Sequence, residues 1–370
     1  MTAPFRLPVP PGQADVAARQ AVRFRAVDPA DPREATRIGA FLAGHREASA
    51  FHRPQWLAAV ADGTGQRGWA MLAEIAGELV GYLPLTEVHS PLFGRLLASS
   101  GFAVGGGLLR CGGWNPGPLF AALEELALRL SCPSIELRGG VLPADRRGWT
   151  LVGNAHAGFC AALAGDDESQ LAAIPRKQRA ELRKGLAAEL AVSVGRNREA
   201  LAAHYAVYAE SLRNLGTPVF PRGLFAAVLA QFDEDADILT VHHRGRPVAS
   251  VLSLYHRGTV LPYWGGGTTA ARALRANDRM YFALMSHARG RGCERFDFGR
   301  SKTGSGAWHF KRNWGFEPQP LTYARWTAPG SAPRDADPRS ARHAARIALW
   351  QRLPLALANR LGPPIARGLG

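Results

Sequence analysis

The amino-acid sequence predicts an α/β (α+β) fold made of two similar units, each a mixed, mostly antiparallel sheet flanked by helices. Segments with the two-residue period of strands and the 3.6-residue period of helices follow one another in the same order in both halves of the chain. A chain of 370 residues is long enough to form two domains. Hydrophobic residues make up 46% of it, which is enough for a sizeable core and argues against global disorder.

The first half is predicted to contain a strand, two helices, a hairpin that turns at Ala76–Gly77, a third antiparallel strand, a helix and two further strands. The predicted strands span 22–27, 70–76, 78–88, 96–102, 134–138 and 159–163, and the predicted helices span 32–48, 54–61 and 116–129. The last of these strands is expected to close the sheet of the first unit.

The second half repeats this order, so the sequence predicts a tandem pair of units. Its predicted strands span 190–194, 237–243, 248–256, 259–264, 294–298 and 321–326, and its predicted helices span 198–215, 221–232, 271–290 and 307–314. Gly265, Gly266 and Gly267 are expected to form a loop between a strand and the long helix. The predicted organisation is a mobile Pro-rich lead-in at 1–20, a first unit at 21–165, a connecting basic helix at 166–190, a second unit at 191–328, and a linker with a basic tail at 329–370.

The net charge of +15 favours partners that carry phosphate, such as nucleic acid, anionic lipid headgroups or nucleotide-linked substrates. The four cysteines show no CxxC spacing, which argues against a zinc site and a disulfide framework and favours free thiols in a reducing cytoplasm. No apolar run approaches the about 18 residues that cross a bilayer. We therefore expect a cytoplasmic protein without a transmembrane segment, which can act at the inner face of the membrane.

The stretch 297–316, DFGRSKTGSGAWHFKRNWGF, is the one around which the rest is organised. It is predicted as a strand end that a glycine stops, a cationic loop with Arg300, Ser301 and Lys302, and a short helix that carries Lys311. Backbone N–H groups, a helix N-terminus and cations would meet there. The stretch therefore predicts a site for a negatively charged group, with a solvated basic loop as the alternative.

Few side chains are available for chemistry. Asp297, at a strand end inside the cationic stretch, is a candidate base for an attacking amine or hydroxyl, and its alternative structural role is to pair with Arg300 or to cap the loop. Tyr263, Asn277 and Tyr281 are further polar side chains that could line a cleft. No Ser-His-Asp order, HExxH motif, Cys/His cluster or carboxylate pair occurs at a convincing spacing, so we expect no metal and no covalent enzyme intermediate.

The connecting helix carries a second group of cations. On a helix that starts at Arg176, the side chains of Arg179 and Arg183 share a narrow arc with it, and Lys177 lies beside them. Only Glu181 opposes them in charge. The pattern predicts a clamp for a phosphate-bearing substrate, with a solvated helix face as the alternative.

The tail contains a predicted basic amphipathic helix over residues 341–353. Ile347, Trp350 and Leu353 lie on its apolar side, and the prolines from Pro354 onward are expected to break anything longer. Three partners fit this pattern: an anionic membrane surface, a neighbouring protein, or the second unit, which the helix would cap.

The same stretches carry a resemblance to a known family. The motifs are DFG and FK-WGF in the stretch 297–316, together with Ala50–His52 and Trp56, Leu83–Leu85 and Leu92–Gly94, Pro175–Arg179, and Gly216–Pro221. With them the chain resembles, over about residues 35–326, the Fem-type peptidyltransferases of the GNAT acyltransferase superfamily, above all the FemAB-like group associated with the PEP-CTERM/exosortase system. The resemblance implies tandem GNAT-like domains.

The resemblance also implies roles for residues. It puts Lys311, the lysine of the FK motif, at the reacting carbonyl, where its charge would stabilise a tetrahedral oxyanion. In a GNAT unit the place of Gly265–Gly267 receives the pyrophosphate of an acyl donor on backbone N–H groups. Arg300 departs from the family, since many Fem proteins have a second glycine there. No tightly bound cofactor is implied; acyl-CoA or aminoacyl-tRNA would be a co-substrate.

Two functions from different classes follow. The first is an acyl- or aminoacyl-transferase that acts by direct attack of an amine or hydroxyl, with a phosphate-bearing small-molecule or lipid-linked precursor of the cell envelope or an exopolysaccharide as acceptor. The second is a non-catalytic basic adaptor that binds nucleic acid or anionic membrane on a transferase-like fold.

Overall fold

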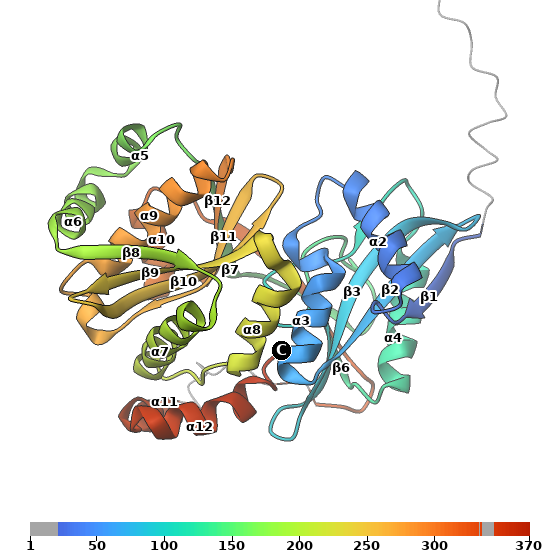
Figure 1. The fold of residues 1–370 in the computed structure, drawn as a ribbon. Coiled ribbons are helices and arrows are strands. Elements are labelled where there is room, and N and C mark those ends of the chain that lie inside the picture. The colour runs from blue at the N-terminus through green and yellow to red at the C-terminus, as the bar shows by residue number, and fades with distance from the viewer. Residues whose placement is uncertain (1–20, 333, 335–343) are drawn as a thin grey trace, which may run out of the picture.

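A single mixed sheet runs through both halves of the chain in the computed structural model, which describes residues 21–332, 334 and 344–370 (Figure 1). The predicted lead-in at 1–20 lies outside this part. The strands are β1 (Arg23–Val27), β2 (Arg67–Ile75), β3 (Glu78–Ser90), β4 (Gly94–Ser99), β5 (Leu109–Arg110), β6 (Ser134–Arg138), β7 (Trp149–Ala162), β8 (Leu190–Gly195), β9 (Ala236–His243), β10 (Arg246–His256), β11 (Thr259–Gly267), β12 (Arg295–Lys302) and β13 (Gln319–Thr327). Their order in the 13-stranded sheet is β1-β2-β3-β4-β6-β13-β7-β12-β11-β10-β9-β8, with β5 paired to β3.

Helices cover the sheet and confirm the predicted α/β class (Figure 1). They are α2 (Pro32–Gly44), α3 (Pro54–Thr64), α4 (Gly117–Arg129), α5 (Asp167–Ala173), α6 (Arg176–Ala187), α7 (Arg198–Leu215), α8 (Arg222–Phe232), α9 (Ala276–Gly290), α10 (Gly306–Asn313), α11 (Ala344–Arg352) and α12 (Leu355–Ala366), with short 3₁₀ turns at Ala50–His52, Asp233–Asp235 and Thr269–Ala271. Several begin at sequence signals for helix starts. Pro32 follows the capping Asp31 in α2, and Asn197 caps α7.

The predicted repeat appears as two parallel strand pairs, one in each half. β4 pairs with β6 across α4, and β11 pairs with β12 across α9, each over only two residue pairs. The neighbouring strands are antiparallel, as expected for each unit. The last strand of the chain, β13, does not stay at an edge, because it lies between β6 and β7 and ties the two halves together.

Two expectations about strands and one about a helix are wrong. The strand predicted over 159–163 is the end of the longer β7, which pairs with β12 and β13 rather than closing the first unit. Gly299 does not stop β12: it adopts a φ of 66° at a bulge, and the strand resumes its pairing with β7 at Arg300. Pro363 and Pro364 lie inside α12 rather than breaking it.

The halves share a core as well as a sheet. α3 of the first half packs so closely on α8 of the second that a Cβ on Gly63 would lie 2.3 Å from the Cα of Leu224. Trp56 of α3 stacks on Trp264 of β11 with ring centroids 5.9 Å apart, and its indole N–H donates to the carbonyl of Gly101. Trp56 therefore packs between the halves.

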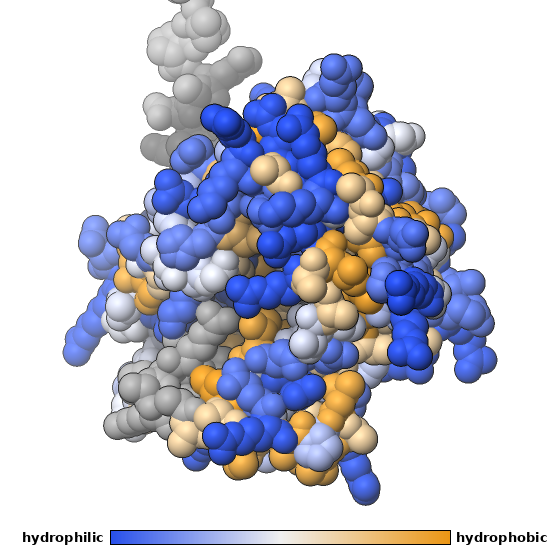
Figure 2. Space-filling view, turned by 90° about the vertical axis from the view of Figure 1, so that its left-hand side faces the viewer, coloured by the Kyte–Doolittle hydropathy of each residue, from blue (hydrophilic) through white to orange (hydrophobic). Residues whose placement is uncertain are grey.

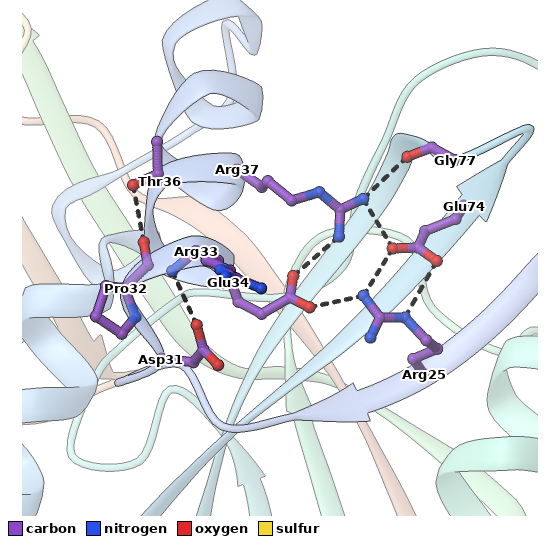
Figure 3. Close-up of polar contacts among 9 residues, drawn as sticks. All are labelled: Arg25, Asp31, Pro32, Arg33, Glu34, Thr36, Arg37, Glu74 and Gly77. Carbon is purple, nitrogen blue, oxygen red and sulfur yellow. Dashed lines mark hydrogen bonds and ion pairs between the residues drawn. The ribbon is translucent and has the colours of Figure 1, made fainter.

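A network of alternating charges anchors α2 to the first two strands (Figure 3). The Glu74 carboxylate of β2 accepts hydrogen bonds from Arg25 of β1 at 3.0 and 3.1 Å and from Arg37 of α2 at 2.8 Å. Glu34 of α2 bridges the same two arginines at 2.7 and 2.9 Å. Arg37 also donates to the carbonyl of Gly77 in the β2–β3 turn at 2.9 Å, so each charge has opposite neighbours.

Replacing Glu74 with glutamine is expected to lower the free energy of unfolding at pH 7 by about 1.5 kcal/mol, since charge-assisted hydrogen bonds to two arginines are weakened. The hydrogen bond from Arg25 and the Arg37 contacts hold the pKa of Glu74 below its ordinary 4.5. The stabilisation is therefore complete above pH 4.5 and is lost as the pH falls through the lower pKa of the folded state. Denaturant titrations at pH 7 and pH 3 should show the difference shrink, whereas the exposed Glu78→Gln should change little at either pH.

The C-terminal helices pack back on the protein. Ile347 of α11 lies against the end of α7, where a Cβ on Gly216 would meet its side chain at 2.4 Å. Gly362 of α12 lies against Val219, and Gly368 lies against Ser90 at the end of β3. None of the helices described here is long and apolar enough to cross a membrane.

Candidate active site

The parallel pair β11–β12 opens after its first two residue pairs. Thr259 pairs with Arg295 and Val260 with Phe296, and no pairing between these strands follows in the described part of the chain. β11 instead continues along β10 up to its final glycines. Beyond Val260, the backbone groups of β11 that face β12 therefore form no hydrogen bonds with it, and a gap lies between the two strands.

Gly265, Gly266 and Gly267 are the end of β11, not the predicted loop, because they pair with Val251, Ser250 and Ala249 of β10. Their missing side chains make room for three polar groups from neighbouring helices. A Cβ on Gly265 would lie 2.9 Å from the hydroxyl of Tyr281, one on Gly266 2.6 Å from the hydroxyl of Ser211, and one on Gly267 2.6 Å from the side-chain oxygen of Asn277. Their role in holding a donor stays a prediction.

Tyr281 of α9 stands beside the gap. Its ring contacts Phe298 of β12 edge-on at 4.9 Å, while its hydroxyl lies next to Gly265 of β11. Burial raises the pKa of Tyr281 to about 12, so the hydroxyl remains a neutral donor and acceptor at pH 7. Tyr281 therefore contacts both β11 and β12 where the two strands separate.

Two buried oxygen atoms at the start of α9 have no hydrogen-bond partner among the described residues. They are Oγ1 of Thr268, directly after β11, and Oδ1 of Asn277 in the first turn of α9. Buried polar atoms are nearly always paired in folded proteins, so unpaired ones beside a gap indicate a place for a ligand's polar groups. With the N-terminal amides of α9, these residues could hold the polar part of an acyl donor.

Lys311 of α10 is buried under the bulge of β12. Its ammonium group donates to the carbonyls of Phe298 at 2.6 Å and of Gly299 and Arg300 at 3.2 Å each. Burial lowers the pKa of Lys311 to about 8, against the opposing effect of Asp297. The ammonium therefore fixes the bulge from which Arg300 projects, and its predicted role at an oxyanion stays a prediction.

Asp297 lies on β12 immediately before the bulge. Its carboxylate accepts a hydrogen bond from the backbone N–H of Gly299 at 2.8 Å, which is the local capping contact expected as one of its structural alternatives. Burial raises its pKa above the ordinary value of 3.8, although the N–H of Gly299 and the charge of Lys311 act in the other direction. A carboxylate with a raised pKa is better suited to accept a proton.

Arg300 and Tyr263 connect the second half to a loop of the first. Arg300 donates to the hydroxyl of Tyr323 on β13 at 2.9 Å, and Tyr323 in turn donates to the carbonyl of Val104 at 3.0 Å. The hydroxyl of Tyr263 donates to the carbonyl of Phe102. Arg300 was predicted in a loop, but it lies in β12 beyond the bulge.

Ser301 and Lys302 follow Arg300 on β12. Ser301 is buried, and its hydroxyl has no hydrogen-bond partner among the described residues. Lys302 pairs in register with His156 of β7, whose ring stacks on Tyr323 with centroids 5.8 Å apart. Burial and the charge of Arg300 lower the pKa of His156 to about 4, so the imidazole is neutral at pH 7.

Several residues in the region where β6, β13 and β7 meet were not predicted from the sequence. Arg138 of β6 is buried, and it donates to Glu136 at 2.9 Å and to the carbonyl of Ala103 at 2.8 Å. Tyr323 of β13 pairs in register with Arg138. No local motif marks Arg138, His156 or Tyr323, because they meet only through the position of β13 between β6 and β7.

The cations of α6 lie on a helix that contacts the start of α9, where Glu181 of α6 pairs with Arg275. α6 packs on α9 at the outer edge of the second half (Figure 1), and Arg176, Lys177 and Arg183 are exposed there. Arg179 is partly buried and donates to the carbonyl of Ile174 at 3.2 Å. The hydrogen bonds that the structure shows for these four residues do not reach Arg300 or Lys311. Figure 2 views this side and shows a largely hydrophilic surface, so phosphate binding by α6 stays a prediction.

Within the described residues, no group of three or more His, Cys, Asp or Glu side chains lies close enough to hold a metal ion. Two surface grooves lie between α7 and α8 and between α3 and α12, and residues of the gap between β11 and β12 line neither of them. The candidate active site is therefore the gap itself with its flanking side chains.

Comparison with known proteins identifies this architecture. The model of the family described as acetyltransferase (GNAT) domain matches residues 174–312, which include the open strand pair and Lys311. The chain has a tandem GNAT-like fold. The match supports an acyltransferase. No curated protein matches the sequence.

Solved structures share this tandem GNAT-like fold at low identity. FemX superposes with a TM-score of 0.59 at 15% identity, over 78% of this chain and 95% of that one. A tandem GNAT protein from the clavulanic acid biosynthesis pathway gives 0.55 at 13% identity, over 84% and 100%. The C-terminal domain of a putative lysylphosphatidylglycerol synthetase from Agrobacterium fabrum gives 0.51 at 16% identity, over 79% and 92%. These similarities establish the fold.

Proposed function

We propose that the protein is an acyl- or aminoacyl-transferase of the Fem/GNAT type, acting in the cytoplasm at the inner face of the membrane. Its acceptor would be a phosphate-bearing precursor of the cell envelope or of an exopolysaccharide, as in the exosortase-associated group that the sequence resembles. The observation that carries the proposal is the open strand pair β11–β12, beside which Thr268 and Asn277 keep buried oxygen atoms unpaired. Enzymes stabilise the transition state with polar groups whose positions are fixed before the substrate binds.

The proposed reaction is a direct attack. The nitrogen or oxygen of the acceptor forms a bond to the carbonyl carbon of the donor, and the bond from that carbon to the donor's sulfur or oxygen breaks. Asp297 takes the proton of the acceptor, which its raised pKa favours. The positive charge of Lys311, in a buried environment where charge acts strongly, stabilises the negative oxygen of the tetrahedral intermediate.

The basic residues of β12 and α6 are proposed to hold the acceptor's phosphate. Arg300 presents its guanidinium group from the bulge that Lys311 fixes, and a guanidinium matches phosphate oxygens in two hydrogen bonds. The other residues proposed to bind substrate are Arg176, Lys177, Arg179, Arg183, Tyr263, Asn277, Tyr281, Ser301 and Lys302. tRNA would enter only as the carrier of an aminoacyl donor.

The donor is proposed to lie along β11, with its polar part at the start of α9. Asn277→Ala is expected to raise the KM for the donor about tenfold with a smaller change in kcat, because one buried hydrogen bond of about 1.4 kcal/mol is lost. Release of free thiol from acyl-CoA, or of free tRNA from aminoacyl-tRNA, measures the reaction. A matched control is Asn313→Ala in α10, which changes an exposed asparagine.

The donor assay also separates the two classes of function. A transferase should show a saturable preference for one donor, and mass spectrometry of molecules that co-purify with the protein should identify an acceptor or donor. Binding of polyanions of every kind, with an affinity that falls steeply as salt rises and no turnover with any donor, would instead indicate the adaptor.

A further inference from the structure

The two C-terminal helices carry several of their large apolar side chains on the outside. On α12, Leu357 and Leu361 are 41% and 44% exposed, and on α11, Leu349 is 66% exposed. The inner side of α12 consists of the small residues Ala358, Gly362 and Ala366, which are buried. A helix that merely caps a domain buries its largest apolar side chains, so α12 departs from this arrangement at Leu357 and Leu361.

The packing of the inner side of α12 explains why its leucines are exposed. A Cβ on Gly362 would lie 3.0 Å from the backbone nitrogen of Val219, so the helix approaches the protein through its backbone. Leu357 and Leu361 are four positions apart and therefore project from one face, to which Pro364 also belongs. The close approach leaves no room for leucine on the inner side and directs this face outward.

α11 divides its apolar residues between the two sides. Ile347, on the apolar side predicted from the sequence, lies against Gly216 at the end of α7. That part of the helix caps the protein, which is one of the alternatives expected for the tail. Leu349 points away from this contact and is exposed.

The exposed leucines are surrounded by positive charge. Arg346, Arg352, Arg360 and Arg367 are all exposed on or directly after these helices, and residues 338–370 contain no acidic side chain. The β3–β4 turn adds Leu92, which is 67% exposed and lies two residues from Ser90, the contact of Gly368. At the lower end of the molecule, where Figure 1 places α11 and α12, Figure 2 shows apolar and hydrophilic patches side by side.

We propose that the outer face of α11 and α12, with Leu349, Leu357 and Leu361 among the arginines, docks on an anionic lipid surface. Leucine side chains would enter the boundary between headgroups and acyl chains, while the arginines stay at the level of the lipid phosphates. The charge selects this partner, because exposed leucines on helices whose only charged side chains are arginines suit a negatively charged surface that is apolar beneath. This function is independent of the proposed transfer reaction.

The test is co-sedimentation of the full chain with vesicles of phosphatidylcholine alone and of phosphatidylcholine mixed with phosphatidylglycerol. We expect binding to the anionic vesicles and little binding to the neutral ones. The variant with Leu349→Ser, Leu357→Ser and Leu361→Ser should bind the anionic vesicles at least about tenfold more weakly, since three apolar side chains no longer insert. The variant with Arg346→Gln, Arg352→Gln and Arg360→Gln should lose the preference for anionic lipid.

A matched control is Leu128→Ser, which changes a leucine of α4 that is 55% exposed and should leave vesicle binding unchanged. Thermal unfolding of each variant confirms that the fold is kept. Absence of binding to anionic vesicles, or equal binding by the triple serine variant, would overturn the proposal. So would a dimer in sedimentation velocity that the serine variant dissociates, because the leucines would then be the contact between two copies.

Discussion

Lys311→Met is expected to reduce turnover at least about a hundredfold and to lower the free energy of unfolding by about 3 kcal/mol. Methionine fills much of the same space but leaves the carbonyls of Phe298, Gly299 and Arg300 without their shared donor. A buried carbonyl that loses its donor keeps the full penalty of having left water. The bulge would relax, and Arg300 and Asp297 would lose their fixed positions.

The pH dependence of stability tests the burial of this lysine independently of catalysis. The pKa of Lys311 is about 8 in the folded protein and ordinarily 10.5, because burial disfavours the ammonium. Between these values the unfolded chain holds a proton that the folded protein has released, so the free energy of unfolding rises with pH. The stability advantage of the wild type over Lys311→Met should therefore grow from pH 8 to pH 10.5.

Denaturant titrations at several pH values in this window measure that difference, and donor assays measure the turnover. Lys184→Met is the matched control, since Lys184 is 62% exposed in an ion pair with Glu181 and should matter by less than about 0.5 kcal/mol. A Lys311→Met protein with full turnover would remove Lys311 from the mechanism. A stability difference that does not change with pH would show that the lysine is not buried as described.

The order of elements could be predicted from the sequence because its signals are local. The hairpin at Ala76–Gly77 is confirmed, with both residues at positive φ in the turn between β2 and β3. The strand, long helix and second strand predicted over 259–264, 271–290 and 294–298 are likewise confirmed as β11, α9 and β12. Such features depend on neighbours within a few residues.

The predictions fail where residues distant in the sequence determine the local structure. A glycine after a strand usually ends it, but β12 continues past Gly299 because β7 offers pairing on the far side of the bulge. Gly265 to Gly267 resemble a loop, yet β10 keeps them in the sheet and side chains from α7 and α9 need their space. Lys311 was found through a family motif, whereas its three carbonyl partners follow from the bulge. No periodicity predicts that β13 lies between β6 and β7.

Arg138→Met is expected to lower the free energy of unfolding by about 3 to 5 kcal/mol, the usual effect of removing one partner of a buried ion pair. Arg138 is 5% exposed and donates to Glu136, to the carbonyl of Ala103 and, at 3.0 Å, to the carbonyl of Gly370. Methionine leaves all three acceptors without this donor. Denaturant titration at pH 7 measures the loss.

Much of that loss of stability should come from the buried carboxylate of Glu136, which remains without Arg138 as its partner. Burial alone would raise the pKa of Glu136, but the charges of Arg138 and Arg325 hold it at about 2. Without Arg138, only Arg325 remains, and its side chain is 53% exposed. Combining Arg138→Met with Glu136→Leu removes the stranded carboxylate, so the double variant should be more stable than Arg138→Met alone.

The exposed pair of Arg129 and Glu125 supplies the control, because Arg129→Met should change stability by less than about 0.5 kcal/mol. A loss of under 1 kcal/mol for Arg138→Met would contradict the burial of this arginine between the halves. A double variant no more stable than the single one would mean that the carbonyls of Ala103 and Gly370, rather than Glu136, depend on Arg138. Either result would locate the interaction that holds β6, β13 and the end of the tail together.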